Sequence, residues 1–319
     1  EALGVFFEKL GVIRDLLHGC EIDGFMQNPH AFIPKIANFV IGLDDGKKRF
    51  ADASAALSKA YSLVNSQEAA IAHREEVALY QAIRVMLTKG DHTQKKVTDK
   101  EREILIRQAL SRGIVPEGII DVFSVAGLKH PDIGLLSEEF LREIRAMKEK
   151  NLAAEALARL LKDEIKARFK LNIVKNSRYS DLLEEALSKY RNRGFETAQL
   201  IEALIDLAKE LNEQIKAGNV DGLSDYEVAF YDALEVNEAA VRGMEHETLV
   251  RLAQELTKKV RDNIKVDWSV RESTQAALRV MVRDLLDKYG YPPDFSNQAI
   301  ETVIKQAESL KEEWLEQGL

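Results

Sequence analysis

The chain has 319 residues, of which 45% are apolar and 31% charged, with a formal net charge of −8. This composition predicts a soluble globular protein of one large or two ordinary domains and excludes a disordered chain. The acidic balance argues against a surface that grips phosphates throughout. The only cysteine, Cys20, excludes an intrachain disulfide and a cysteine zinc site, and a free thiol fits a reducing cytosol, so we expect a cytoplasmic protein.

The chain opens in an amphipathic pattern, "EALGVFFEKLGVIRDLL", without an initiator methionine, which indicates a piece of a longer protein. A polar loop, "TKGDHTQKK", ends the first region near residue 96, and "VTDKEREILIRQAL" begins the second. No fixed repeat period is present, which disfavours a solenoid. We therefore expect two loosely separated helical subdomains, 1–96 and 97–319.

No proline occurs between Pro131 and Pro292, and helix-forming residues fill this tract. Because proline breaks helices, its absence favours long ones. Apolar stripes at helical spacing run through 183–208 and 269–289, and Gly290 is expected to cap the second of these helices before Pro292 stops it.

Strand signals are weak. Short strands are conceivable only at "LNIV" (171–174) and "NIKVDW" (263–268), because no sustained alternation of apolar and polar residues occurs. The sequence therefore predicts a mainly α protein, an irregular multi-helix bundle with few or no short strands.

No complete active site is recognisable in the sequence. "GLDDGKK" (42–48) resembles a phosphate loop but has its glycines one residue too close, so we expect an ordinary turn. Asp132 with Glu164 and Lys166 imitates the spacing of a metal-dependent nuclease, but Glu164 and Lys166 fall in a helical pattern, where residues two apart face different ways. The six histidines form no metal-binding motif. We expect a non-catalytic chain with no cofactor or metal of its own.

A basic cluster within an acidic chain is the first candidate contact site. Lys189, Arg191 and Arg193 precede an acidic amphipathic helix. One interpretation is a solvated surface in which these cations pair with Glu184, Glu185 and Glu196. The other is a contact for a partner subunit or for DNA, and the sequence leaves both open.

A second basic stripe forms the other candidate. Arg271, Arg279 and Arg283 span an arc of about 120° on one expected helix face. This stripe suits DNA or a partner, or ion pairs with a neighbouring helix. Trp268, Tyr289 and Tyr291 are expected to be core or packing residues rather than platforms for stacked bases.

Three segments resemble a known family. They are "NSRYSDLLEEALSKYRNRGFETAQLIEALIDLAKEL" (176–211), "GLSDYEVAFYDAL" (222–234) and "VDWSVRESTQAALRVMVRDLLDKYGYPPD" (266–294). They are similar to the C-terminal region of the restriction (motor, R) subunit of bacterial type I restriction-modification enzymes. Weaker similarity extends from about residue 10 to about residue 310, through 36–63, 75–87 and 117–168.

The resemblance implies a role within a larger assembly. The full subunit of that family is a type I site-specific deoxyribonuclease, a hydrolase with a nuclease domain, two motor domains and a helical C-terminal part. It binds ATP and Mg²⁺ and pulls DNA past methyltransferase and specificity subunits. This chain would then be the structural and docking domain that couples the motor domains to that core, and possibly to DNA. The alternative is a stand-alone helical adaptor that binds protein only.

Overall fold

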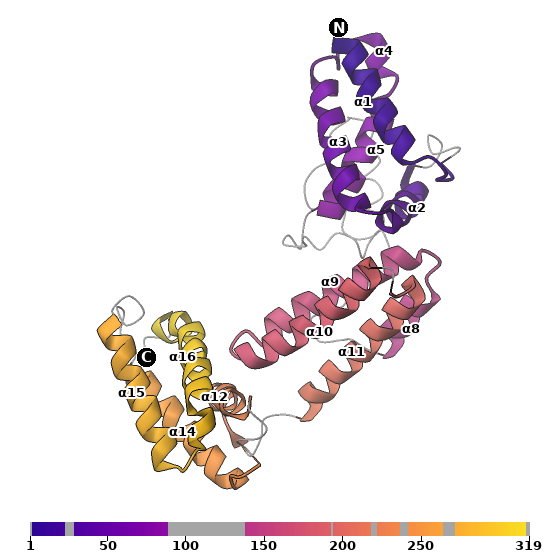
Figure 1. The fold of residues 1–319 in the computed structure, drawn as a ribbon. Coiled ribbons are helices and arrows are strands. Elements are labelled where there is room, and N and C mark those ends of the chain that lie inside the picture. The colour runs from indigo at the N-terminus through magenta and orange to yellow at the C-terminus, as the bar shows by residue number, and fades with distance from the viewer. Residues whose placement is uncertain are drawn as a thin grey trace. The chain divides into compact units, whose positions relative to one another are not determined.

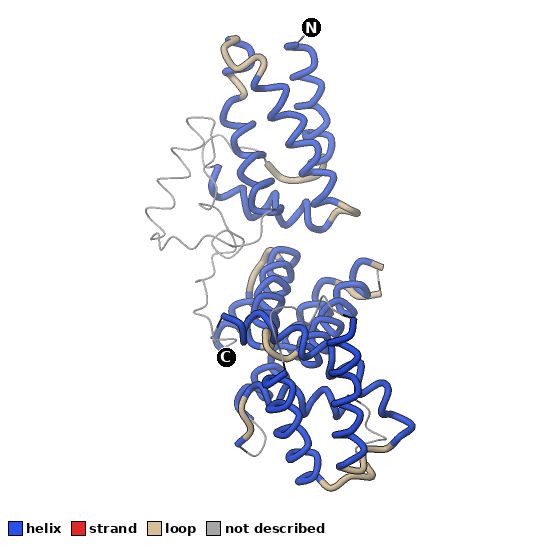
Figure 2. Tube along the Cα trace, turned by 90° about the vertical axis from the view of Figure 1, so that its left-hand side faces the viewer, coloured by secondary structure: helices blue, strands red, loops and turns tan. Residues whose placement is uncertain are grey.

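The structure is a computed structural model that describes residues 2–22, 29–88, 138–192, 194–217, 222–236, 242–263 and 272–316. These residues form thirteen helices and no strand, which confirms the mainly α class (Figures 1 and 2). No helix in these ranges is both long and apolar enough to cross a membrane.

Most helices span between nine and 24 residues. Their bounds are α1 Ala2–Leu16, α2 Pro29–Gly42, α3 Gly46–Ser62, α4 Glu68–Ile71, α5 Arg74–Thr88, α8 Glu138–Ala146, α9 Lys150–Arg168, α10 Ile173–Arg191, α11 Thr197–Ala217, α12 Asp225–Glu235, α14 His246–Asn263, α15 Glu272–Lys288 and α16 Pro293–Glu316.

The chain divides into two compact units. The first comprises residues 1–160 and 189–205, and the second comprises residues 161–188 and 206–319. The division falls within α9, α10 and α11, so each of these helices contributes to both units. The domain boundary expected after residue 96 lies in 89–137, outside the described residues, and stays a prediction.

The N-terminal part of the first unit is a bundle in which α1 and α5 pack against α3 (Figure 1). Phe6 and Leu10 of α1 and Phe50 of α3 are fully or almost fully buried. The ring of Phe50 meets the ring of Tyr80 edge-on, with centroids 6.1 Å apart. Apolar residues spaced three or four apart supply this core, which is the pattern that predicts an amphipathic helix.

A polar network crosses the same bundle. The Arg14 guanidinium donates from Nε to Glu76 Oε1 at 2.9 Å and from Nη2 to Glu76 Oε2 at 2.7 Å. Tyr80 donates its hydroxyl to Glu76 Oε1 at 2.9 Å, and His73 Nδ1 lies 3.3 Å from Glu76 Oε2. A buried carboxylate needs such partners, so this network ties α1 to α5.

The segment "GLDDGKK" forms the corner between α2 and α3, as predicted. Asp45 takes a left-handed conformation with φ of 49°. A Cβ on Gly46 would lie 2.0 Å from the backbone oxygen of Val40, so only glycine fits there. Lys47 of α3 forms an ion pair with Glu155 of α9 at 2.9 Å and so connects these two helices.

The second unit packs α12, α14, α15 and α16 around one apolar core. The Phe230 and Trp314 rings stack with centroids 6.3 Å apart. Ser224 and Glu227 form a capping box that starts α12. Gly290 follows α15 with φ of 71°, which confirms the predicted helix end.

The tyrosines after α15 are packing residues, as predicted. Tyr291 is buried and donates its hydroxyl to the Leu234 carbonyl at 2.9 Å, and Tyr289 is partly buried and donates to Glu255 at 2.6 Å. Trp268 lies outside the described residues.

One secondary-structure expectation is wrong. No strand forms at 171–174, because Asn172 precedes α10 and its side-chain oxygen accepts the Lys175 N–H at 3.0 Å. This hydrogen bond is typical of a helix N-cap. The other expected strand, 263–268, begins at the last residue of α14, and 264–268 lie outside the described residues.

Candidate interaction surface at the end of α10

The basic cluster lies at the end of one helix rather than at the head of the next. Lys189 and Arg191 form the last turn of α10, and α11 begins only at Thr197. Arg193 lies outside the described residues. Cations at a helix C-terminus stabilise it, because the last carbonyls carry partial negative charge. Lys189 and Arg191 therefore help to stabilise the end of α10.

The backbone after α10 folds back on this last turn. The Lys189 carbonyl accepts the Gly194 N–H at 2.7 Å and the Phe195 N–H at 3.2 Å. The Lys189 ammonium sits 5.6 Å from the centroid of the Phe195 ring, in range for a cation–π contact. Arg191 is exposed, and both cations, like Glu184 and Glu185, make further interactions. The structure thus leaves the solvated and the contact interpretations open.

A single asparagine fixes the two helices that flank the cluster. Tyr190 of α10 and Thr197 of α11 both donate to Asn151 Oδ1, at 3.2 and 2.8 Å. Asn151 in turn donates from Nδ2 to the Asn38 carbonyl at 3.1 Å. The Asn38 side chain accepts the N–H groups of Asn151 and Leu152, at 2.9 and 3.3 Å. The exposed cations are therefore held on a rigid frame made by α2, α9, α10 and α11.

The same asparagine packs closely against a glycine. A Cβ on Gly42 would lie 2.6 Å from Asn151 Nδ2, so the end of α2 leaves room for the amide. Sequence reasoning missed Asn38, Gly42 and Asn151. Asn38 and Asn151 are 113 residues apart, and no local pattern marks either one.

An ion pair and two hydrogen bonds connect the helices around this frame. Arg145 of α8 donates to Glu202 of α11 from Nε to Oε1 at 2.9 Å, from Nε to Oε2 at 3.2 Å and from Nη2 to Oε2 at 2.6 Å. Arg159 donates to the Met86 and Leu87 carbonyls, at 3.1 and 3.2 Å, and so satisfies the end of α5.

The carboxylate of Glu155 lies between Lys47 and Arg159. Burial alone would raise the pKa of Glu155, but these two cations outweigh it and lower the pKa. Glu155 therefore stays ionised at neutral pH and links α3 to α9.

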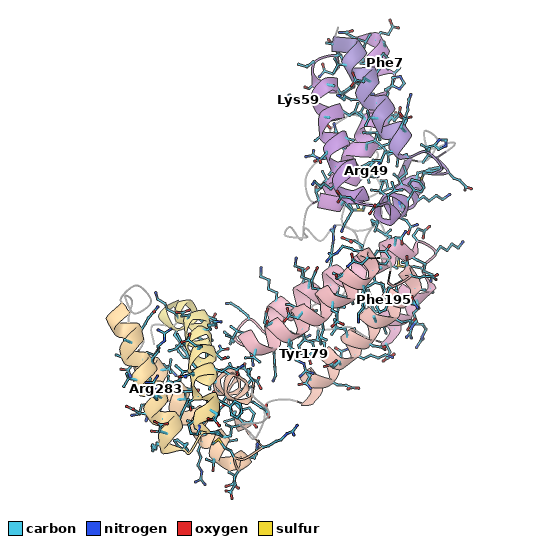
Figure 3. The ribbon with its side chains drawn as sticks, viewed as in Figure 1. Phe7, Arg49, Lys59, Tyr179, Phe195 and Arg283 are labelled. Carbon is cyan, nitrogen blue, oxygen red and sulfur yellow. The ribbon has the colours of Figure 1, made fainter. Side chains whose placement is uncertain are left out.

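The second basic stripe is partly paired. Arg279 of α15 donates from Nε to Glu301 Oε1 of α16 at 3.2 Å, which raises the pKa of Arg279. Arg283 is exposed (Figure 3), and Arg271 lies outside the described residues. At least one of the three arginines thus serves the α15–α16 contact, an alternative that the sequence left open. The two basic clusters belong to different units.

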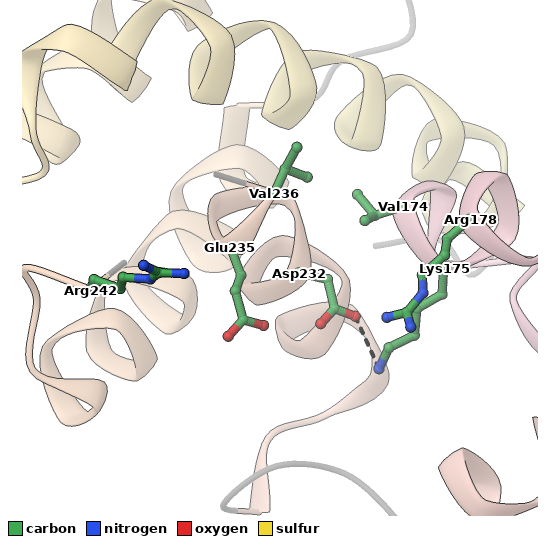
Figure 4. Close-up of a pocket in the computed structure, with 7 residues that line it drawn as sticks. All are labelled: Val174, Lys175, Arg178, Asp232, Glu235, Val236 and Arg242. Atoms are coloured by element: carbon green, nitrogen blue, oxygen red, sulfur yellow. Dashed lines mark ion pairs between the residues drawn. The ribbon is translucent and has the colours of Figure 1, made fainter. Parts of the chain in front are cut away.

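The second unit also contains a charged pocket of about 590 Å³, which the sequence did not indicate (Figure 4). Its lining residues come from α10, α12 and the segment before α14, and they are Val174, Lys175, Arg178, Asp232, Glu235, Val236 and Arg242. Lys175 pairs with Asp232 at 3.1 Å, and Arg178 pairs with Glu210 at 3.1 Å. Asp232 also accepts from Asn172 Nδ2 at 2.5 Å. These charges are paired within the protein, and the Lys175–Asp232 pair connects α10 to α12. We therefore interpret the pocket as part of the contact between these helices.

Of the residues that imitate a nuclease, Glu164 and Lys166 both lie on α9. Glu164 pairs with Arg168 one turn along α9 at 2.5 Å, and Asp132 lies outside the described residues. Among the residues that the structure describes, no group of three or more His, Cys, Asp or Glu side chains is placed to hold a metal ion.

The described part of the chain is thus an all-helical body with exposed cations fixed at a helix end. Over residues 1–313 the chain matches the family described as Type I restriction enzyme HindI endonuclease subunit-like, C-terminal. The chain belongs to this family, and the sequence resemblance to the C-terminal region of the R subunit is confirmed.

Two curated relatives support the assignment. The chain is 35% identical over 267 residues to the Type I restriction enzyme HindI endonuclease subunit of Haemophilus influenzae, covering 84% of this chain and 25% of that protein. It is 28% identical over 270 residues to the Putative type I restriction enzyme MjaIXP endonuclease subunit of Methanocaldococcus jannaschii, covering 84% of this chain and 26% of that protein. The chain therefore spans about a quarter of the length of these relatives. No solved structure matches it significantly.

Proposed function

We propose that this chain is a docking domain that joins the motor of a type I restriction endonuclease subunit to its methyltransferase and specificity subunits. The observation that carries the proposal is the basic end of α10, where Arg191 is exposed on helices that Asn151 holds together. Membership of the endonuclease-subunit family supports it. Binding energy is used most economically when the contact groups are already ordered.

The physical requirement of a translocating motor supports the same role. A motor that pulls DNA needs an anchor that resists the reaction force, and a domain of packed helices could serve as that anchor. ATP and Mg²⁺ would act in the other domains of the complete subunit. Cleavage of DNA would belong there as well, which makes the complete subunit the hydrolase.

A protein partner is favoured over DNA for the basic cluster. A net charge of −8 repels a phosphate backbone at long range, whereas a docking patch needs only local charge complementarity. DNA remains the second candidate because Arg283 presents an exposed cation on α15.

The docking role is tested by reversing charge at the end of α10. The double variant Arg191→Glu/Arg193→Glu is expected to bind the methyltransferase–specificity core at least tenfold more weakly in a quantitative pull-down. The matched control is Lys258→Glu/Arg261→Glu, which reverses two exposed cations on α14 and is expected to bind within twofold of the wild type. Equal binding by both variants would refute the docking site.

A DNA titration at two salt concentrations tests the second candidate. If the cluster binds DNA, removing one phosphate-binding cation should reduce the slope of log affinity against log salt by about 0.9. Under the docking proposal, the α10 variant keeps the slope of the wild type. A reduced slope with an unchanged pull-down would replace the docking role with DNA contact.

The DNA sequence upstream of this coding region tests the alternative, a stand-alone adaptor. A helicase-like reading frame upstream and in phase with the codon for Glu1 is expected under our proposal. A stop codon directly upstream would favour the adaptor.

A further inference from the structure

The outer side of α1 repeats itself after seven residues, in the sequence "GVFFEKL" followed by "GVIRDLL". The recurring pairs are Gly4 and Gly11, Val5 and Val12, and Glu8 and Asp15. Seven residues make almost two helical turns, so the members of each pair lie on one side of α1. We call these six residues the outer face, and it lies opposite the buried side that carries Phe6, Leu10 and Ile13.

The outer face has room for a close neighbour. Val5 and Val12 are 44% and 46% exposed. A Cβ built on Gly4 or on Gly11 would meet no atom within 4 Å. Glycine inside a helix is destabilising relative to alanine, and its usual advantage is the close approach of another backbone. Nothing within the described residues uses that advantage here.

Several exposed large apolar side chains belong to α1 and to the segment 63–71 of the first unit. Among the described residues, eight large apolar side chains are exposed, and five of them lie on α1 or in 63–71. These five are Val5, Phe7, Val12, Leu63 and Ile71. The segment after 63–71 contacts α1, since the Phe7 and His73 rings meet edge-on at 5.6 Å (Phe7 is labelled in Figure 3). Phe7 lies two positions after Val5 and so faces away from the two valines, and the outer face itself exposes Val5 and Val12.

We infer that, in the complete subunit, a helix of the polypeptide preceding this region covers the outer face of α1. The inference rests on the proposed function, in which this chain is part of such a subunit. About three quarters of each curated relative lies outside the match, and the family description places the matched region at the C-terminal end. The remaining polypeptide of such a subunit therefore joins the region near α1.

The repeat also defines the chemistry of the covering helix. A seven-residue repeat suits a helix that runs alongside α1 at a crossing angle of about 20°. Its apolar side chains would pack between the valines and over the glycines. Asp15 is exposed on the outer face, so a Lys or Arg on the covering helix would complement its charge.

Hydrogen exchange compares the complete subunit with the isolated chain. In the complete subunit, Val12→Glu is expected to speed amide exchange across Ala2–Leu16 at least tenfold. In the isolated chain it should change exchange less than twofold, because Val12 is exposed and glutamate favours a helix at least as well as valine. The control Val280→Glu, at a position 53% exposed on α15, should change exchange less than twofold in both proteins. Equal exchange of α1 in the Val12→Glu and wild-type complete subunits would overturn the inference.

A second variant should change the melting temperature in opposite directions in the isolated chain and in the complete subunit. Gly11→Leu should raise the melting temperature of the isolated chain, because leucine favours the helix and the site is open. The same change should lower the melting temperature of the complete subunit, because the covering helix needs the space. A rise in both proteins would overturn the inference.

Two further outcomes separate this inference from others. The isolated chain is expected to sediment as a monomer, and a dimer that Val12→Glu dissociates would assign the outer face to a second copy instead. Capture by the methyltransferase core is not part of the readout. A failed docking experiment together with tenfold faster exchange in the Val12→Glu complete subunit would therefore reject the proposed docking site and support this inference.

Discussion

Replacing Arg14 with glutamine is expected to lower the free energy of unfolding by about 2–3 kcal/mol. The Glu76 side chain is only 6% exposed and accepts two hydrogen bonds from the Arg14 guanidinium. Removing one partner of a buried ion pair costs about 3–5 kcal/mol, because a charge is left buried without compensation. The Arg14 side chain is 48% exposed, so water replaces part of the interaction and the expected cost is smaller.

The cost is expected to depend on pH. Burial would raise the pKa of Glu76, but hydrogen bonds from Arg14 and Tyr80 and the charge of Arg14 outweigh it and lower the pKa. A lowered pKa stabilises the fold above the unfolded-state value of about 4.3, and this stability is lost as pH falls through the folded-state pKa. The difference between wild type and Arg14→Gln should therefore be full at pH 7 and shrink as the pH falls below about 4.

Urea unfolding followed by circular dichroism at pH 7 and at pH 3.5 measures this difference. The matched control is Arg49→Gln, because Arg49 is exposed and, among the described residues, its side chain donates only to the Asp44 carbonyl, at 3.3 Å. The control is expected to change the free energy of unfolding by about 0.5 kcal/mol or less. A loss below about 1 kcal/mol for Arg14→Gln at pH 7, or an equal loss at both pH values, would refute the reasoning.

Three further predictions follow from the fold and the site. Circular dichroism of the isolated chain should report helix in well over half of the residues, and a strand-dominated spectrum would reject the fold. The isolated chain should neither hydrolyse ATP nor cut linear or supercoiled DNA with Mg²⁺ present, and turnover abolished by Lys47→Ala or Glu164→Ala would contradict this. Asn151→Ala should cost about 2–3 kcal/mol in urea unfolding, because it leaves the Tyr190 and Thr197 hydroxyls without their acceptor. The exposed control Asn263→Ala should lower the free energy of unfolding much less. An equal decrease for both variants would contradict the proposal that Asn151 connects α10 and α11.

The helices were predictable because local chemistry encodes them. The proline-free tract from Pro131 to Pro292 holds most of the C-terminal helices, and Gly290 ends α15 with positive φ as expected. The apolar stripe through 183–208 was also real, but two helices share it. Gly194 was the available signal for the break, and the interval 192–196 separates α10 from α11.

Contacts between distant residues were beyond sequence reasoning. Ile173 and Val174 favour strands by propensity, yet the Ile173 N–H is accepted by Gln306, 133 residues away, and Asn172 caps the helix. The frame around Asn151 is of the same kind, because its partners come from three other helices. The sequence pattern predicts the basic cluster. It does not predict that Asn151, far away in the sequence, connects the helices that carry the cluster.

Calorimetric titration of the isolated chain into the methyltransferase–specificity core tests the docking role most directly. We expect one copy of the chain to bind per docking site with a Kd of about 1 μM or tighter, because the helices that flank the cluster are packed together before binding. The Arg191→Glu/Arg193→Glu variant should bind at least tenfold more weakly. No heat of binding and no co-sedimentation with the core, under conditions in which the complete subunit assembles, would contradict the account.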